Sequence, residues 1–129
     1  MKRDGILNPR LSFLLAGLGH TDTVVVADCG LPRPPGVEVV DLALVFGVPT
    51  FEQVLRALST ELVVERALIA AESLERNRGV RRLVESLFVA PDTVDHEEFK
   101  RCTCDASLLV RTGEASPYAN AILRCGVPF

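Results

Sequence analysis

Two polar residues, His20 and Asp28, lie on either side of a run of valines in GLGHTDTVVVADCGLP, residues 17–32. Histidine titrates near neutral pH and can donate or accept a proton, and Asp22 is close enough in sequence to orient its ring. A carboxylate where a strand ends can bind sugar hydroxyls or act as a base, because ligands of open α/β sheets gather there. The pair predicts half of an acid–base site. The alternatives are a histidine at a helix C-terminus and a loop aspartate that accepts backbone N–H groups.

A second set of polar residues lies in the C-terminal third of the chain. The segment DHEEFK places His96 and Lys100 four positions apart, so a helix would put both on one face, where they could converge on a polyol or an anion. The alternative is a solvated surface turn. In GEASPYANAIL, Tyr118 and Asn120 supply a phenol and an amide beside a strand start, and both groups can donate and accept hydrogen bonds. The alternative there is a capped turn with Tyr118 packed down.

Composition narrows the classes of function. The chain has 129 residues, 48% of them hydrophobic, and a net charge of −3. So small a chain cannot easily bury that much apolar material alone, so we expect some of it in a subunit interface. The charge gives no case for nucleic-acid binding, and no apolar run is long enough for a membrane span. The N-terminus lacks the pattern of a signal peptide, which predicts a cytoplasmic protein.

The four cysteines and the absence of common motifs bear on cofactors. In the cytoplasm the thiols would stay reduced, and the simplest interpretation is that they are small apolar side chains. The alternative is a zinc site with His96, Cys102 and Cys104, for which a fourth ligand is not obvious. Phosphate-binding loops, dinucleotide fingerprints, nucleophile elbows and zinc-protease motifs are absent from the sequence. We therefore predict no metal and no nucleotide or redox cofactor.

The elements that must position these residues predict an α/β fold, a single mixed domain over 1–129 with helices packed around a central β-sheet. Asn8-Pro9 favours a helix that stops before His20, and Thr50 with Gln53 makes a capping box for a helix to about Leu58. Further helices are expected over 72–85, with a break near Gly79, and over 95–101. Strands are expected at 23–27, 37–45, 87–89, 107–111 and 121–125, while residues 62–70 suit either a strand or a helix.

Together, these stretches resemble the D-ribose pyranase family and its wider group with the fucose mutarotases. The matching pieces are GILNPRLSFLLAGLGHTDTVVVADCGLP, VDLALVFGVPTFEQVL, HEEFK and VRTGEASPYANAILRCGVPF. They run from near the N-terminus to the last residue, so the resemblance covers essentially the whole chain. The piece HTDTVVVADCGLP favours the ribose branch over the fucose branch.

The resemblance implies a cofactor-free isomerase that interconverts the pyranose and furanose forms of D-ribose by acid–base ring opening and reclosure, and so supplies furanose for ribose phosphorylation. It implies His20 as the acid–base residue. It also implies a set of sugar contacts: Asp28, His96, Lys100, Tyr118 and Asn120, with Ala119 contributing backbone. It implies a homodecamer of two stacked five-membered rings, with pockets near the subunit contacts. Two alternatives are a mutarotase of fucose or another sugar and a non-catalytic sugar-binding accessory of ribose uptake.

Overall fold

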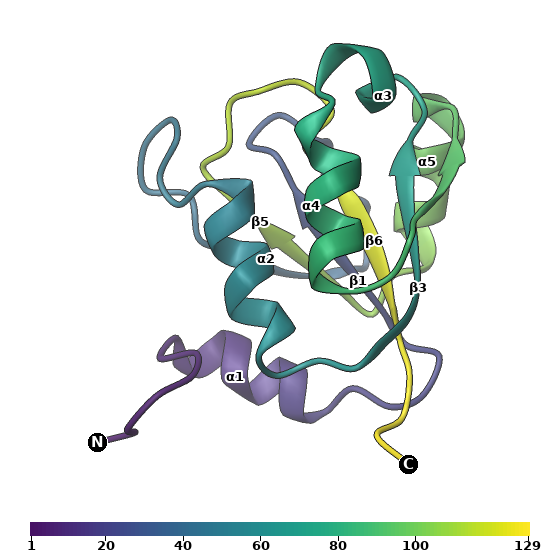
Figure 1. Cartoon of the computed structure of the whole chain (residues 1–129). Helices are drawn as coiled ribbons and strands as arrows, with labels where there is room; N and C mark the ends of the chain where they lie inside the picture. Colours follow the sequence, from purple (N-terminus) through teal and green to yellow (C-terminus); the bar gives the residue numbers. More distant parts are fainter.

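A six-stranded mixed β-sheet lies at the centre of the fold, with helices on both faces (Figure 1). The computed structural model describes residues 1–129. The strands, in the order β2-β5-β1-β6-β3-β4 across the sheet, are β1 (Thr23–Ala27), β2 (Glu38–Asp41), β3 (Val64–Ala70), β4 (Asp92–Val94), β5 (Leu108–Arg111) and β6 (Ala121–Cys125). The helices are α1 (Pro9–Ala16), α2 (Phe51–Ser59), α3 (Ser73–Arg76), α4 (Gly79–Leu87) and α5 (His96–Cys102), with a 3-10 turn at Thr103–Asp105. None of these helices is both long and apolar enough to cross a membrane.

The central strand β1 is buried on both faces, which explains its uninterrupted apolar sequence. Val24 and Val26 face the larger core, to which α1, α2 and α4 contribute. Val25 and Ala27 face a smaller core on the other side of the sheet, with Phe99 of α5. The alternation of side chains along a strand thus divides one valine run between two layers of helices.

The helix starts follow the expected capping chemistry. The side chain of Asn8 accepts a hydrogen bond from the N–H of Leu11 at 2.9 Å, and Pro9 begins α1. Thr50 and Gln53 form the predicted capping box at the start of α2. Asp95 caps α5 by accepting from the N–H of Glu98 at 2.9 Å. Since these caps satisfy N–H groups that have no partner within the helix, the local sequence determines where α1, α2 and α5 begin.

Several predicted elements differ from the structure. The break predicted near Gly79 in the helix over 72–85 is confirmed, since α3 and α4 are divided at residues 77–78, and the ambiguous segment 62–70 contains strand β3. The strand predicted over 37–45 is too long, because β2 ends at Asp41 and the chain then turns into a loop closed by a hydrogen bond from Leu44 N to Val48 O at 3.0 Å. The strand predicted over 87–89 is wrong, because Leu87 ends α4 and Phe88 and Val89 follow the helix, all three packed against the core. The strand there is β4, whose exposed Asp92 and Thr93 give it no apolar pattern.

The direction of the strands gives the sheet two distinct ends. Five strands run the same way and only β6 is reversed. The carboxyl ends of five strands therefore lie at one end, together with the start of β6. Figure 1 shows α3 at this end, and α1 and both chain termini at the other.

Candidate functional site

Asp28 and Asn120 form a rigid pair at the carboxyl end of the sheet. Asp28 follows β1 and Asn120 precedes β6, which is the neighbouring antiparallel strand. The Asn120 amide donates to Asp28 Oδ2 at 2.7 Å, and the N–H of Asp28 donates to Asn120 Oδ1 at 2.8 Å. The N–H of Gly30 donates to Asp28 Oδ1 at 2.9 Å. The alternative of a loop aspartate that accepts a backbone N–H is thus also realised, and these bonds hold the carboxylate in one orientation.

Tyr118 and His96 lie beside each other at the same end. Their rings meet edge to face, with centroids 5.1 Å apart. Tyr118 has a φ of +58°, a left-handed conformation that is rare for an aromatic residue, so the surrounding structure must hold it in place. Ala119, which lies between Tyr118 and Asn120 in the sequence, is buried. Lys100 lies one turn after His96 on α5, as predicted, and its Nζ is 2.6 Å from Glu97 Oε1.

The turn before Tyr118 is clamped by side chains that the sequence did not single out. Both carboxylate oxygens of Glu114 accept backbone N–H groups at 3.1 Å, one from Phe51 and the other from Ser116. Burial alone would raise the pKa of Glu114, but these hydrogen bonds outweigh burial and lower it. Asn77 donates to the hydroxyl of Ser116 at 2.9 Å. The loop that presents Tyr118 is therefore fixed to α2 and to the α3–α4 junction.

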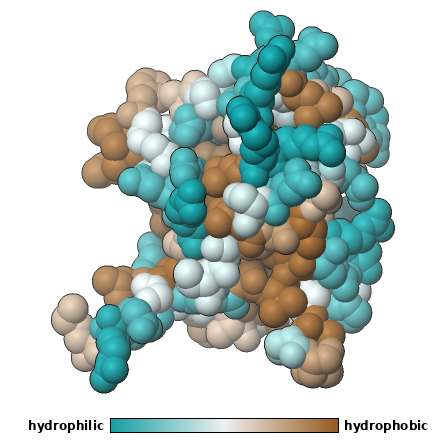
Figure 2. Space-filling model, viewed as in Figure 1, coloured by the Kyte–Doolittle hydropathy of each residue, from teal (hydrophilic) through white to brown (hydrophobic).

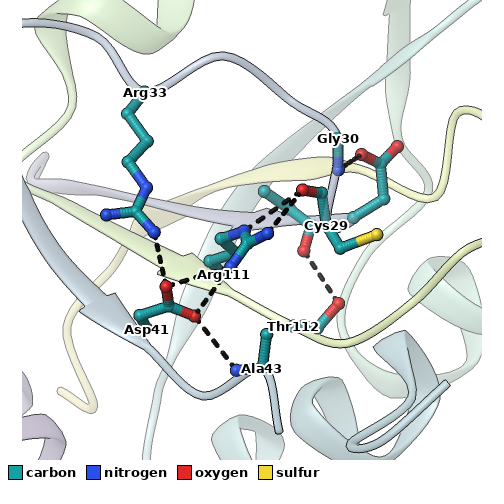
Figure 3. Close-up of polar contacts among 9 residues, drawn as sticks. Cys29, Gly30, Arg33, Asp41, Ala43, Arg111 and Thr112 are labelled. Atoms are coloured by element: carbon teal, nitrogen blue, oxygen red, sulfur yellow. Dashed lines mark hydrogen bonds and ion pairs between the residues drawn. The ribbon is translucent and has the colours of Figure 1, made fainter. Parts of the chain in front are cut away.

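A second clamp holds the turn that follows Asp28 (Figure 3). The Arg111 guanidinium donates to the carbonyl of Cys29 from Nη2 at 2.9 Å, and its Nη1 is 3.0 Å from Asp41 Oδ2. Arg33 also pairs with Asp41. Burial would raise the pKa of Asp41, but a hydrogen bond from the N–H of Ala43 and the two guanidinium groups together lower it. Arg111 and Asp41 face each other only because β2 and β5 pair in this register, which no local pattern could reveal.

His20 lies at the other end of the sheet, in the exposed loop between α1 and β1. Its Nε2 is 2.9 Å from Oε2 of Glu65 on β3. This hydrogen bond, with the charges of His20 and Arg124, lowers the pKa of Glu65. The prediction that Asp22 orients His20 is wrong. Asp22 instead accepts from the N–H of Gly19 at 2.7 Å and from the hydroxyl of Ser107 at 3.0 Å.

The structure thus brings most of the candidate residues together and leaves His20 apart. Asp28, Tyr118, Asn120 and His96 share the carboxyl end, whereas His20 precedes β1. A strand rises about 3.3 Å per residue, so the five residues of β1 put roughly 16 Å between its ends. A sugar bound beside Asp28 is therefore out of reach of His20 in the same chain.

The cysteines do not gather around a histidine. All four are free thiols. No three His, Cys, Asp or Glu side chains lie close enough together to hold a metal ion. The Sγ atoms of Cys102 and Cys104 instead lie 3.8 Å from Glu98 Oε1 and from the Lys100 carbonyl oxygen, respectively. His96, Cys102 and Cys104 therefore do not form the zinc site considered as an alternative.

Known proteins place the chain in a family. Residues 1–128 match the model of the RbsD / FucU transport protein family. The chain belongs to this family. Membership confirms the resemblance seen in the sequence, and the α/β fold agrees with it.

The names of several proteins that are similar to this chain refer to ribose. The D-ribose pyranases of Corynebacterium glutamicum (strain R) and Exiguobacterium sibiricum are 52% and 50% identical to this chain over the full length of both partners. The structure of Bacillus subtilis RbsD complexed with D-ribose matches with a TM-score of 0.94 and 46% identity, covering all of both chains. A fucose mutarotase from Streptococcus pneumoniae in complex with L-fucose has a TM-score of 0.82 but only 21% identity, so it shares the fold.

Proposed function

We propose that this protein is a D-ribose pyranase, an isomerase that interconverts the pyranose and furanose rings of D-ribose. The observation that carries the proposal is the 52% identity, without terminal gaps, to a D-ribose pyranase. The site agrees with it, because a carboxylate, an amide and a phenol at the carboxyl end of the sheet offer the acceptors and donors that a pattern of hydroxyl groups requires. His96, Lys100 and the backbone of Ala119 complete the proposed sugar contacts.

The reaction needs only proton transfers around one carbon atom. In ring opening, O1–H loses its proton as the C1=O1 aldehyde bond forms, the C1–O5 bond breaks, and O5 takes the electron pair and a proton. The open chain then turns, O4 loses its proton as it adds to C1, and O1 is protonated again. The product is the furanose, with no net change in electrons. A positioned group of near-neutral pKa and a cage of hydrogen bonds suit this chemistry, so no cofactor is required.

We infer that the active site is shared between two copies of the chain. Asp28, Tyr118 and Asn120 would hold the sugar in one copy. His20, which lies roughly 16 Å away along β1, would transfer protons to a sugar bound by the neighbouring copy. The open position of His20, with only Glu65 as a partner, suits a group that acts on another chain.

Two surfaces at opposite ends of the sheet support such a head-to-tail contact, one an exposed apolar loop and the other a groove of mixed lining. The loop over residues 42–49, which we call the apolar loop, lies beside the Asp28 end and exposes Leu44, Val45 and Phe46, the last at 84%. In Figure 2 hydrophobic surface projects at the upper left, where Figure 1 shows the loop that leads into α2. The apolar loop borders a hollow of about 370 Å³ that reaches Cys29 and Arg111. At the opposite end, a groove of about 300 Å³ beside His20 has a mixed lining, in which Glu61 and His20 lie among apolar residues: Leu15, Leu18, Leu62, Val63 and Val127.

Contacts between unlike surfaces close into rings when the rotation between copies permits it. Burying the apolar loop of one copy against the His20 groove of the next would form such a ring. It would also bring His20 to the sugar-binding end of the neighbour. We propose that this ring has five members and that two rings stack into a homodecamer, as the resemblance to the D-ribose pyranase family implies. We also propose that residues 1–129 act as one domain in the cytoplasm, where the furanose would be phosphorylated.

Saturation-transfer NMR on D-ribose tests the function. The protein should accelerate exchange between pyranose and furanose signals, and a folded His20→Ala variant should not. Faster exchange of fucose anomers than of ribose forms would instead indicate a mutarotase. Ribose binding with no acceleration by the wild type would indicate an accessory protein and would contradict the proposal.

A further inference from the structure

Glu72 has no part in the sugar contacts proposed above, yet it holds His96. It follows β3 at the carboxyl end of the sheet, and its Oε1 accepts a hydrogen bond from the main-chain N–H of His96 at 3.1 Å. Its Oε2 is buried without a partner, and so is Nδ1 of the His96 imidazole. One carboxylate thus binds the backbone of a histidine while its second oxygen and a ring nitrogen of the same histidine both lack hydrogen bonds.

These two unpaired atoms complement each other. Buried polar atoms are seldom left without a partner. A rotation of the imidazole that let Nδ1–H donate to Oε2 would satisfy both. A carboxylate bonded to one ring nitrogen fixes the tautomer and leaves the other nitrogen as the base. In His96 that nitrogen would be Nε2, which makes no hydrogen bond within the chain and is not among the buried unpaired atoms.

The other charged groups around His96 already have partners. Glu97 pairs with Lys100 at 2.6 Å, and Asp95 accepts from the N–H of Glu98 at 2.9 Å. Glu72 is the neighbouring carboxylate whose second oxygen is buried and without a hydrogen bond. His96 lies close to the proposed sugar contacts, because its ring meets Tyr118 edge to face and Tyr118 lies two residues before Asn120.

We propose that Glu72 and His96 form a carboxylate–histidine pair that carries out the second proton transfer of ribose ring interconversion, with Glu72 as the positioning residue. The proposal rests on the proposed function, in which ring opening needs a base at O1 and an acid at O5. When one imidazole takes the O1 proton, the C1–O5 electron pair moves to O5, which is protonated by the other. On closure the second imidazole takes the O4 proton and the first returns its proton to O1. With His20 of a neighbouring copy and His96 in these roles, both histidines end the cycle as they began.

The variant Glu72→Gln separates positioning from packing. Its amide oxygen can still accept from the N–H of His96, but its NH₂ group can pair only with an unprotonated Nδ1, which reverses the tautomer. We expect exchange at saturating ribose to slow by about 10- to 100-fold with KM changed less than about threefold, because an acid–base group acts in the transition state. Glu75→Gln, an exposed glutamate on α3, should behave as wild type and serves as the matched control.

His96→Gln provides a second test, also if Glu72→Gln does not fold. It should slow saturated exchange by at least about tenfold. Adding Glu72→Gln to His96→Gln should slow it little further, since the two residues act as one unit. Saturated exchange at the wild-type rate in either single variant would overturn the proposal.

The tautomer can be observed directly, because the chain has only two histidines. In a His20→Gln variant labelled with ¹⁵N-histidine, the single imidazole signal should show a proton on Nδ1, and adding Glu72→Gln should move it to Nε2. The same tautomer in both samples would overturn the pair. This measurement does not depend on turnover. A wild type that fails to accelerate ribose exchange would therefore refute the proposed function while the NMR result still decides on the Glu72–His96 bond.

Discussion

Asp28 is held from several directions at the carboxyl end of the sheet, by Asn120, by Gly30 and by a turn that Arg111 clamps. His20, at the opposite end, is exposed and bonded through one ring nitrogen to Glu65. The first arrangement suits a group that must recognise a ligand in a fixed orientation, because the cost of ordering it is met during folding. The exposed position of His20 suits a side chain that acts on a sugar bound by a neighbouring copy of the chain. The comparison indicates that residues of one chain bind the sugar, whereas proton transfer requires residues of two chains.

The strongest test of this comparison is complementation between two defective variants. His20→Ala should slow ribose exchange by about 10²- to 10⁴-fold. Asn120→Ala, combined with Tyr118→Phe so that two hydrogen bonds are lost, should impair sugar binding, and exchange is compared at ribose far below saturation, where weaker binding slows it. If each site joins the binding end of one copy to His20 of the next, co-assembly of equal amounts should restore about a quarter of the sites in a ring. The exchange rate of the co-expressed sample measures this. Activity no greater than the sum of the separate variants would place His20 and Asn120 in the same chain's site.

The next test removes the proposed contact and leaves both ends intact. Phe46→Asp puts a charge on the apolar loop at a side chain that is 84% exposed, so the fold of the chain should survive while assembly fails. Light scattering should then report smaller particles, and exchange should fall toward the level of His20→Ala. Ser86→Asp, which adds the same charge at an exposed position of α4, should keep both assembly and activity. An active Phe46→Asp monomer would show that one chain contains the whole site.

Smaller effects should distinguish the residues of the binding end from His20. Asn120→Ala and Tyr118→Phe should raise the Kd for ribose by about 2- to 10-fold for each neutral hydrogen bond lost, which is the range for 0.5–1.5 kcal/mol. Exchange at saturating ribose should change less. Titration of ribose by calorimetry and exchange at saturation measure the two effects. Wild-type affinity with slow exchange in Asn120→Ala would reverse the division between binding and proton transfer.

The smallest effect is expected at Glu65. Its pKa is lowered chiefly by the hydrogen bond with His20, so the pair stabilises the fold at neutral pH and this contribution is lost as pH falls below the usual carboxyl range. Because exposed ion pairs contribute little, Glu65→Gln should lower the melting temperature only slightly at pH 7. The difference from wild type should vanish in acid. Melting curves at pH 7 and below pH 4 test this, and a difference that grew in acid would contradict the assigned sign.

The sequence predicted the elements whose local signals are strong. The β-branched run of β1 and the caps at Asn8 and Thr50 each determine a structure from a few neighbouring residues. β4 was missed because an exposed edge strand of three residues carries no apolar alternation. The apolar loop was taken for part of a strand because its exposed side chains have the same composition as a buried run.

The candidate site was predicted from the sequence as a set of residues, and only the structure gives its arrangement. His20 and Asp28 are close in sequence, yet the strand between them keeps them apart. Glu65, Glu72 and Arg111 were missed because their partners lie on other parts of the fold, such as the α1–β1 loop for His20 and α5 for His96. The identities of the site residues came from resemblance to a family, and their division between the two ends came only with the sheet.

The reversed direction of β6 has a consequence for the proposed ring. This one strand begins beside Asp28, where Asn120 precedes it, and ends beside the His20 loop, where Cys125 exchanges backbone hydrogen bonds with Thr21 and Asp22 at 3.0 and 2.8 Å. Each subunit of a head-to-tail ring would contribute to two active sites, one at each end of β6. The length of a single buried strand would then set the spacing between successive active sites around the ring.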